Sequence, residues 1–261
     1  MKPVIVLLPA YNEEEAIGPL LEQIRDVLRD WPYRVIVVDD GSKDSTVATA
    51  ERYKPSMPLE VIRRPQNGGL GAAMDTGIRH VRSVGSPDAV LVTMDADNTQ
   101  DPAIIPLLVA AIEKGADLAI ASRFAPGAGA IGVPVYRQVL SGGASLLFGM
   151  AIGAFGVKDY TCGYRCYRLT LIERLARRFK PLVRAKGFAV MTELLAKAAA
   201  DGARCAEVPF VLRYDLKPGR SKLQLVPTLF EYARVLLLAR LDALRTAPET
   251  SDSGPKDARA N

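Results

Sequence analysis

Two aspartates, Asp95 and Asp97, come directly after an apolar run at residues 89–94. Side chains two residues apart on an extended backbone point to the same side, so both carboxylates can reach one ion. A hard divalent cation prefers such oxygen ligands and readily bridges to phosphates. Open α/β sheets also bind their ligands at the carboxyl ends of strands. The pair therefore predicts a cation site, although an acidic loop after a strand would give the same sequence.

The strands and helices that must position this pair alternate along the first half of the chain. Apolar runs predict strands at residues 4–8, 34–38, 59–62, 89–94 and 118–122. Helical spacing of apolar residues predicts helices at residues 14–28, 45–53, 71–81 and 103–113. Continuously apolar strands are typical of a largely parallel sheet that helices cover on both faces. Polar clusters follow several strands and predict one ligand-binding edge, formed by residues 9–13, 39–44, 95–101 and 122–123.

The second half of the chain is less regular. Glycines crowd residues 127–132, which predicts a loop, and residues 139–157 carry no charge. The uncharged stretch is long enough to span a bilayer, but it is rich in glycine and serine and lacks a strongly basic flank. It is therefore predicted to be a packing or interfacial helix. A helix at residues 191–200 and a strand at residues 206–212 follow it.

The chain ends in a basic amphipathic helix, predicted at residues 226–244, and a polar tail. Such a helix can lie on a membrane surface or pack against the domain. The tail, from Thr246 onward, has the composition of a disordered segment. We therefore expect one α/β domain at residues 1–223, an amphipathic helix suited to a membrane interface at residues 224–245, and a disordered tail at residues 246–261.

Composition narrows the class of protein. The net charge of +5 suits anionic ligands such as nucleotide diphosphates, or an anionic membrane surface. No arginine-rich tract with interleaved aromatics occurs, so a nucleic acid partner is not expected. Cys162 and Cys166 lack a second pair of ligands and His80 lies far along the chain, so a zinc site is not expected. The N-terminus enters a strand at once and the cysteine number is odd, which together predict a cytoplasmic protein.

Several short segments occur in an order that is more informative than any one of them. They read LPAYNEE at 8–14, VVDDGS at 37–42, NGGLG at 67–71, MDAD at 94–97, SR at 122–123, DYTCGYR at 159–165 and GRSK at 219–222. With these segments the chain resembles the family 2 glycosyltransferases of GT-A fold, in particular their dolichol-phosphate mannosyltransferase-like branch. The resemblance runs from about Pro3 to the final helix and implies a Rossmann-like nucleotide-binding sheet.

The resemblance implies a nucleotide-sugar pocket. In such a pocket Tyr11 packs, Glu13 accepts a hydrogen bond from the ribose, and Asp39 accepts hydrogen bonds from the base. The implied pocket residues are Pro9, Tyr11, Glu13, Asp39, Asp40, Gly68, Gly71, Asp95, Ala96 and Arg123. Without the family pattern, Tyr11 could equally be a packing residue, and residues 39–42 could be a turn that caps the next helix.

The resemblance also implies a cofactor and an acceptor site. Asp95 and Asp97 would hold Mg²⁺ or Mn²⁺ against the donor diphosphate. Gln100 is the first choice for a third protein ligand, although it stands one residue beyond the family position. Asn98 or Asp101 could take its place. The implied acceptor-phosphate residues are Arg137, Ser141, Arg213, Ser221 and Lys222.

The implied reaction is an inverting transfer, in which the acceptor oxygen attacks the anomeric carbon from behind. A hydroxyl acceptor would need a general base, for which Asp159 and then Glu193 are candidates. Asp159 could instead orient the acceptor, and Glu193 could belong to a buried ion pair. A phosphate acceptor has a second pKa of about 6 and needs no base. The implied catalytic residues are Asp95, Asp97, Asp159, Arg213 and Lys222.

The sequence therefore predicts a metal-dependent transferase for a hexose, with mannose favoured. The donor would be a nucleotide-sugar, with GDP-mannose favoured, and the acceptor a polyprenyl phosphate, which implies a protein on the inner face of the membrane. A first alternative is a family 2 enzyme that uses a UDP-sugar and a hydroxyl acceptor, with Asp159 as base. A second alternative is a nucleotide-sugar-binding protein without turnover.

Overall fold

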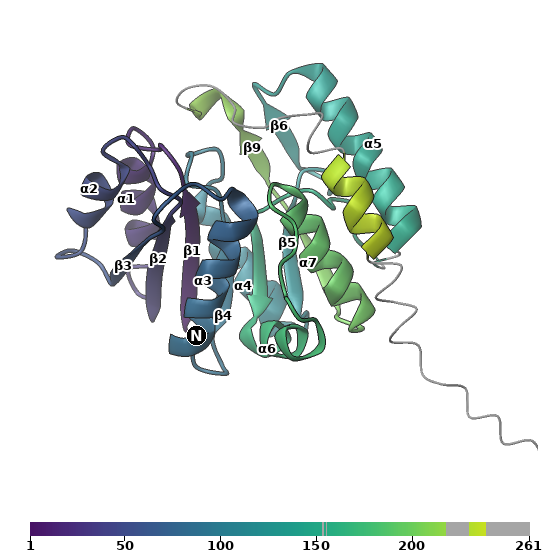
Figure 1. Cartoon of the computed structure of the whole chain (residues 1–261), viewed down its shortest axis with the longest axis horizontal. Helices are drawn as coiled ribbons and strands as arrows, with labels where there is room; N and C mark the ends of the chain where they lie inside the picture. The colour runs from purple at the N-terminus through teal and green to yellow at the C-terminus, as the bar shows by residue number, and fades with distance from the viewer. Residues whose placement is uncertain (153, 155, 218–229, 239–261) are drawn as a thin grey trace, which may run out of the picture.

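A central sheet in the strand order β3-β2-β1-β4-β7-β5-β8 organises the chain, as Figure 1 shows. The computed structural model describes residues 1–152, 154, 156–217 and 230–238. The strands of the sheet are β1 (Val4–Ala10), β2 (Tyr33–Asp39), β3 (Leu59–Arg63), β4 (Val90–Thr93), β5 (Leu118–Ser122), β7 (Arg165–Arg168) and β8 (Cys205–Pro209). All neighbours pair in parallel except β7, which is antiparallel to both β4 and β5. The prediction of a largely parallel sheet is confirmed.

Helices cover the sheet on both faces. They are α1 (Ile17–Val27), α2 (Thr46–Glu51), α3 (Leu70–Val84), α4 (Ile105–Glu113), α5 (Val135–Ile152), α6 (Leu169–Arg178) and α7 (Ala189–Ala200), with short 3₁₀ helices at Pro102–Ile104 and Tyr214–Leu216. In Figure 1, α3 and α7 lie in front of the sheet and α4 lies behind it. The apolar strands are buried between these layers, so burial of their continuous apolar runs stabilises the domain.

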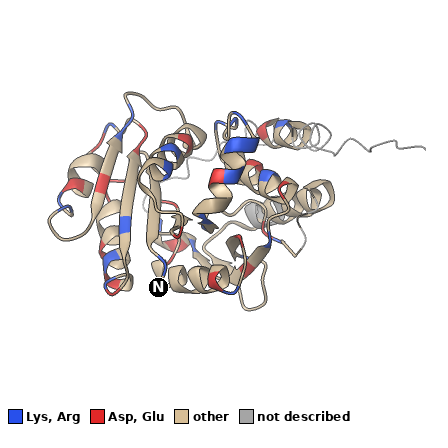
Figure 2. Cartoon of the chain, turned by 90° about the horizontal axis from the view of Figure 1, so that it is seen from below, with Lys and Arg blue, Asp and Glu red and all other residues tan. Residues whose placement is uncertain are grey.

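Charged residues of both signs are interspersed over the helices in Figure 2. An example is the ion pair between Arg82 on α3 and Glu173 on α6, with 2.9 Å between the arginine Nε and the carboxylate Oε1. The positive residues behind the net charge of +5 therefore lie among negative ones. The ligand-binding edge must be identified from its own residues, not from the total charge.

The prediction of one continuous strand at residues 206–212 is wrong, because the structure has two strands there. β8 ends at Pro209, and β9 (Val211–Arg213) leaves the main sheet to pair in parallel with β6 (Gly129–Ile131), so part of the predicted glycine loop is a strand. Phe210 stands between the two strands and is buried, with its ring edge-on to Tyr164 at 5.9 Å between centroids. Burial of this aromatic ring fixes the point at which the chain passes from one sheet to the other.

The uncharged stretch at residues 139–157 is mostly helical, as predicted, within α5. Phe148 of α5 is buried and packs edge-on against Tyr232, with 4.9 Å between the ring centroids. Tyr232 belongs to a helix at residues 230–238, the part of the predicted final helix that the structure describes. This helix packs beside α5 in Figure 1, whereas the predicted tail lies outside the described residues. Within the described chain, no helix is both long and apolar enough to cross a bilayer.

Candidate active site

The loops that follow β1 and β2 are joined by hydrogen bonds between side chains and backbone. The Asn12 amide donates to Ser42 Oγ at 2.9 Å, and the Lys43 amide donates to Asn12 Oδ1 at 2.8 Å. The Glu13 amide donates to Thr46 Oγ1 at 2.8 Å. These bonds hold the loop that carries Pro9, Tyr11 and Glu13 against the loop that carries Asp39, so the structure brings these predicted pocket residues together.

The two aspartates at the end of β2 have different local roles. Asp39 is buried, and its Oδ1 accepts a hydrogen bond from the Ser42 amide at 3.1 Å, as expected for a turn. Asp40 is also buried and accepts from the amides of Gly68 and Gly69, at 3.1 and 2.8 Å, while pairing with Arg64. Asp40 therefore fixes the glycine-rich loop, whereas contact of either aspartate with a nucleotide stays a prediction.

The glycine-rich loop leads into α3 through a tightly packed turn. Gly69 has a φ of +84°, a conformation that glycine adopts without strain. The Gly71 amide donates to the carbonyl of Lys186 at 2.8 Å. A Cβ atom on Gly71 would lie 1.8 Å from the carbonyl oxygen of Ala185, so no side chain fits there. The start of α3 is thus set by contact with the segment before α7.

Asp95 and Asp97 lie beyond the end of β4, each held by neighbouring polar groups. Gln100 binds Asp95 twice: its Nε2 donates to Asp95 Oδ2 at 2.8 Å, and its Oε1 accepts from the Asp95 amide at 2.9 Å. Asp97 Oδ1 accepts from the Thr99 hydroxyl at 2.6 Å, and Asp97 Oδ2 pairs with the ammonium of Lys217. Burial, with the negative charge of Asp97 beside it, raises the pKa of Asp95 to about 7 despite the opposing charge of Lys217.

This carboxylate pair fits a hard divalent cation. Two close carboxylates, one with a raised pKa and one paired with an ammonium, form a site where positive charge is favoured. In the described part of the chain, no three or more His, Cys, Asp or Glu side chains gather as a complete metal site. The Asp95 and Asp97 carboxylates could supply two oxygen ligands to such a cation.

The three candidates for a further metal ligand have different surroundings. Both amide atoms of Gln100 bind Asp95, so in this geometry Gln100 orients Asp95. Asp101 Oδ1 accepts from the Ala103 amide at 2.8 Å and caps the short helix that follows. Asn98 donates to the Ala16 carbonyl at 3.1 Å, and its buried Oδ1 has no hydrogen-bond partner within the described residues. The ligand assignment to Gln100 stays a prediction.

Lys217 is a site residue that the sequence did not single out. It follows β9, whose Arg213 amide donates to the Thr99 carbonyl at 2.9 Å and so ties β9 to the aspartate loop. The Arg213 side chain pairs with Asp215 at 2.8 Å and is 42% exposed. The basic character of residues 213–222 was the available signal, but it pointed equally to Arg213, Ser221 and Lys222. The latter two lie outside the described residues.

A second cluster forms around Arg123, directly after β5. The Arg123 guanidinium donates to both carboxylate oxygens of Asp159, at 2.8 and 2.7 Å. It also donates to Ser141 Oγ on α5 at 3.1 Å and to Thr161 Oγ1 at 2.7 Å. The structure thus brings together Arg123, Ser141 and Asp159 from distant parts of the sequence. Arg137 lies on α5, but its side chain is outside the described part of the structure.

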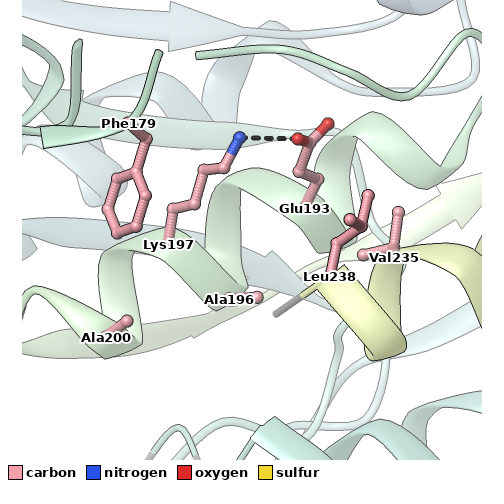
Figure 3. Close-up of a pocket in the computed structure, with 7 residues that line it drawn as sticks. All are labelled: Phe179, Glu193, Ala196, Lys197, Ala200, Val235 and Leu238. Atoms are coloured by element: carbon pink, nitrogen blue, oxygen red, sulfur yellow. Dashed lines mark hydrogen bonds and ion pairs between the residues drawn. The ribbon is translucent and has the colours of Figure 1, made fainter. Parts of the chain in front are cut away.

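The two base candidates are both engaged in ion pairs. Burial alone would raise the pKa of Asp159, but the hydrogen bonds and charge of Arg123 outweigh it and hold that pKa below its usual range. Glu193 is buried and pairs with Lys197 at 2.6 Å, as Figure 3 shows. A carboxylate with a lowered pKa and with strong donors on both oxygens is a weak proton acceptor. This geometry favours the orienting role of Asp159 and the buried ion pair of Glu193.

Sequence comparison relates the chain to known proteins. The model of the family described as glycosyl transferase family 2 matches residues 5–175. A dolichol-phosphate mannosyltransferase of Pyrococcus furiosus is 34% identical over 232 residues, 88% of this chain and 62% of that protein. A polyprenol monophosphomannose synthase of Mycolicibacterium smegmatis is 33% identical over 250 residues, 92% of this chain and 89% of that protein. The chain thus spans less than two thirds of the Pyrococcus protein's length.

Solved structures show the same fold. One is glucosyl-3-phosphoglycerate synthase from Mycobacterium tuberculosis with Mn²⁺, UDP and glucosyl-3-phosphoglycerate. It has a TM-score of 0.65 at 21% identity, covering 95% of this chain and 82% of that one. The same enzyme with Mg²⁺ and UDP has a TM-score of 0.65 at 22% identity, covering 95% and 81%. The α/β fold predicted from the sequence is confirmed.

Proposed function

Since the chain belongs to glycosyl transferase family 2, we propose that it transfers a hexose from a nucleotide-sugar to a polyprenyl phosphate. Mannose is the favoured sugar and GDP-mannose the favoured donor. Support comes from relatives whose names specify mannose transfer to dolichol phosphate or polyprenol, at 34% and 33% identity. The family shows that the chain is a glycosyltransferase. The identities of the sugar, the nucleotide and the lipid are what we propose.

The donor would bind at the shared end of β1, β2 and β4. Asp95 and Asp97 would hold Mg²⁺ or Mn²⁺, and Gln100 would keep Asp95 in place through its two hydrogen bonds. A bound divalent cation supplies charge that offsets the negative charge developing on a leaving diphosphate. Pro9, Tyr11 and Glu13 would line the nucleoside side, because their loop is fixed against the loop after β2.

The acceptor would bind beside the Arg123 cluster. Arg123 carries its positive charge next to Ser141, and Asp159 keeps the guanidinium in one orientation. A guanidinium so placed suits the oxygens of a phosphate. Arg213 and Lys222 would add positive charge for the acceptor phosphate, and Ser221 a hydroxyl, although Ser221 and Lys222 lie outside the described residues. The acceptor oxygen would attack the anomeric carbon from behind, which inverts its configuration.

The pairing of Asp159 with Arg123 is the observation that supports a phosphate acceptor over a hydroxyl acceptor. A hydroxyl acceptor needs a base to take its proton, and Asp159 has a lowered pKa and accepts hydrogen bonds from Arg123 on both oxygens. A phosphate monoester is already largely dianionic at pH 7, since its second pKa is about 6, and it attacks without a base. The alternative with a hydroxyl acceptor and Asp159 as base is therefore disfavoured.

A lipid acceptor would place the protein at the inner face of a membrane. Exposed apolar side chains occur on α5, the helix that carries Ser141, at Leu146, Leu147 and Met150. An apolar helix surface next to the proposed acceptor site suits contact with the lipid interface. Binding would be peripheral, through this surface and the final helix.

A donor and metal assay tests the proposal. Purified protein and a short polyprenyl phosphate would receive GDP-mannose, UDP-glucose or UDP-N-acetylglucosamine, with Mn²⁺ or Mg²⁺. We expect transfer from GDP-mannose, lost in EDTA and reduced about 100- to 1000-fold in Asp97→Ala. Asp30→Ala removes an exposed aspartate outside the site and should keep full activity. Activity that persists in EDTA or in Asp97→Ala would refute the metal role.

A further inference from the structure

Residues 180–187 form a segment, here called the strap, that joins α6 to α7. Its inner side contacts α7, its outer side contacts the start of α3, and its last residue contacts the helix at residues 230–238. The strap thus lies between the nucleotide side of the site and the final helix. Three sets of contacts show how firmly each side is held.

A buried ion pair on α7 holds the inner side of the strap. Glu193 Oε2 accepts hydrogen bonds from the amides of Arg184 and Ala185, both at 2.9 Å. Glu193 Oε1 pairs with Lys197 at 2.6 Å, and Lys197 also donates to the Leu182 carbonyl at 2.6 Å (Figure 3). Both charges are thereby satisfied within the fold, so the pair serves as an anchor for the backbone of the strap.

The outer side of the strap sets the first turn of α3. The Lys186 carbonyl accepts the Gly71 amide at 2.8 Å, and the Ala185 carbonyl oxygen would lie 1.8 Å from any Cβ at position 71. Backbone meets backbone here without an intervening side chain. A shift of the strap therefore moves the glycine-rich loop directly.

The helix at residues 230–238 closes the third side. Glu231 Oε2 accepts a hydrogen bond from the Gly187 amide at 3.0 Å. Val235 and Leu238 of the same helix line one pocket with Glu193 and Lys197, as Figure 3 shows. Tyr232 faces the other way and packs on Phe148 of α5. One short helix therefore touches both the strap and the helix that carries Ser141.

We propose that Glu231 is a positioning residue for nucleotide binding: by holding the Gly187 amide it fixes the strap, and through the Lys186 carbonyl it fixes the turn at Gly71. The inference rests on the proposed function, in which Gly68 and Gly71 border the nucleotide-sugar. It gives the final helix a role in the donor pocket besides any contact with lipid. Glu231 is only partly buried, so its replacement tests the role without leaving a buried charge unpaired.

Amide hydrogen exchange and nucleotide titration together test the role of Glu231. GDP and, separately, UDP would be titrated with Mn²⁺ into the wild type, Glu231→Ala, Glu231→Gln and the control Glu113→Ala, an exposed acid at the end of α4. One lost hydrogen bond to a carboxylate should weaken nucleotide binding roughly three- to tenfold in Glu231→Ala. Exchange of the Gly187 and Gly71 amides should accelerate in the same variant. Glu231→Gln keeps an acceptor oxygen and should stay within about twofold of wild type.

The two readouts separate this inference from the proposed function. Wild-type protein that binds neither nucleotide would refute the proposed function, while the exchange rates alone would still report on the strap. Unchanged exchange at Gly71 in Glu231→Ala would overturn the inference. So would unchanged nucleotide affinity in a variant whose strap exchanges faster.

Discussion

The half of the molecule that carries the proposed donor site and helix α5, which carries part of the proposed acceptor site, differ in how much room they leave around glycine. In residues 4–100, here the donor half, a Cβ on Gly41, Gly71 or Gly77 would come within 2.8, 1.8 or 2.3 Å of another atom. In residues 118–217, the acceptor half, Gly132 and Gly187 are also close-packed, with an added Cβ at 2.8 and 2.7 Å from another atom. On α5, however, Gly142 and Gly143 have no atom of the described residues within 4 Å of an added Cβ. The donor half is therefore close-packed around the proposed nucleotide pocket, whereas α5 of the acceptor half has an open surface.

Polar contacts follow the same division. Successive strand ends of the donor half are joined by side-chain to backbone hydrogen bonds, such as those of Asn12 with Ser42 and of Asp40 with Gly69. In the acceptor half, the buried pair of Arg123 with Asp159 connects β5, α5 and the segment after it, and the buried pair of Glu193 with Lys197 anchors the strap. A nucleotide of fixed shape suits the first arrangement, and a long lipid chain suits the exposed apolar side chains of α5 beside the Arg123 cluster.

The largest expected effect tests the dependence of the acceptor half on that cluster. Asp159→Asn leaves the Arg123 guanidinium without its buried carboxylate and should lower the free energy of unfolding by about 3 kcal/mol. Asp215→Asn breaks the exposed pair with Arg213 and should leave that free energy nearly unchanged. Urea unfolding of both variants gives the comparison. Equal effects would contradict the view that the buried Arg123–Asp159 pair stabilises the acceptor half.

The pH dependence of the same variant has a defined sign. Because the pKa of Asp159 is lowered in the folded state, its ion pair stabilises the protein fully above the unfolded pKa of about 4. That contribution is lost as pH falls through the folded pKa. The stability difference between wild type and Asp159→Asn should therefore be constant near neutral pH and shrink in acid below about pH 4. A difference that grows in acid would contradict the lowered pKa.

A pair of glycine substitutions tests the difference in packing between the donor half and α5. Gly71→Ala places a Cβ against the Ala185 carbonyl and should cost about 1–3 kcal/mol of stability. Gly143→Ala fills open space on α5 and should gain roughly 0.5–1 kcal/mol, because alanine favours the helix. Thermal unfolding measured side by side reports both. If both variants lose stability alike, the contrast between the donor half and α5 is wrong.

The smallest expected effect concerns Lys217, one of the side chains that cross between the halves. Lys217 follows β9 in the acceptor half and pairs with Asp97 in the donor half, so it competes with a cation for that carboxylate. Lys217→Gln should tighten Mn²⁺ binding by about fivefold, or about 1 kcal/mol, in the absence of nucleotide, because it removes the ammonium that occupies Asp97 Oδ2 in this largely buried pair. Lys217→Arg keeps the charge and should bind Mn²⁺ like the wild type. Weaker Mn²⁺ binding in Lys217→Gln would exclude competition.

The sequence predicted the donor half better than the acceptor half, because the donor half is built from local sequence patterns and the acceptor half from contacts between distant residues. Apolar runs such as Val4–Leu8 are local signals for buried strands, and polar residues at strand ends locate the ligand edge. β7 was missed because its Arg165 is fully buried, with its guanidinium donating to the carbonyls of Tyr160 and Met191. The pairing of Lys217 with Asp97 joins residues 120 positions apart and leaves no local pattern.

The sequence predicted which residues belong to the candidate site, but it did not predict which of them contact one another. Arg123, Ser141 and Asp159 were each singled out, and the structure adds that Arg123 binds the other two. The sequence offered Asp159 as a base or as an orienting group, and the choice depended on its burial and partner. Such facts belong to the folded state, since desolvation and charge pairing decide the pKa.

The most direct test of the central claim compares two acceptors that differ only in their phosphate. Wild-type protein would receive GDP-mannose, Mn²⁺ and either a polyprenyl phosphate or the polyprenol of the same chain length. Because Arg123 binds both carboxylate oxygens of Asp159 beside the proposed acceptor site, transfer should occur to the phosphate and be undetectable to the alcohol. Transfer to the alcohol at a comparable rate would contradict the account.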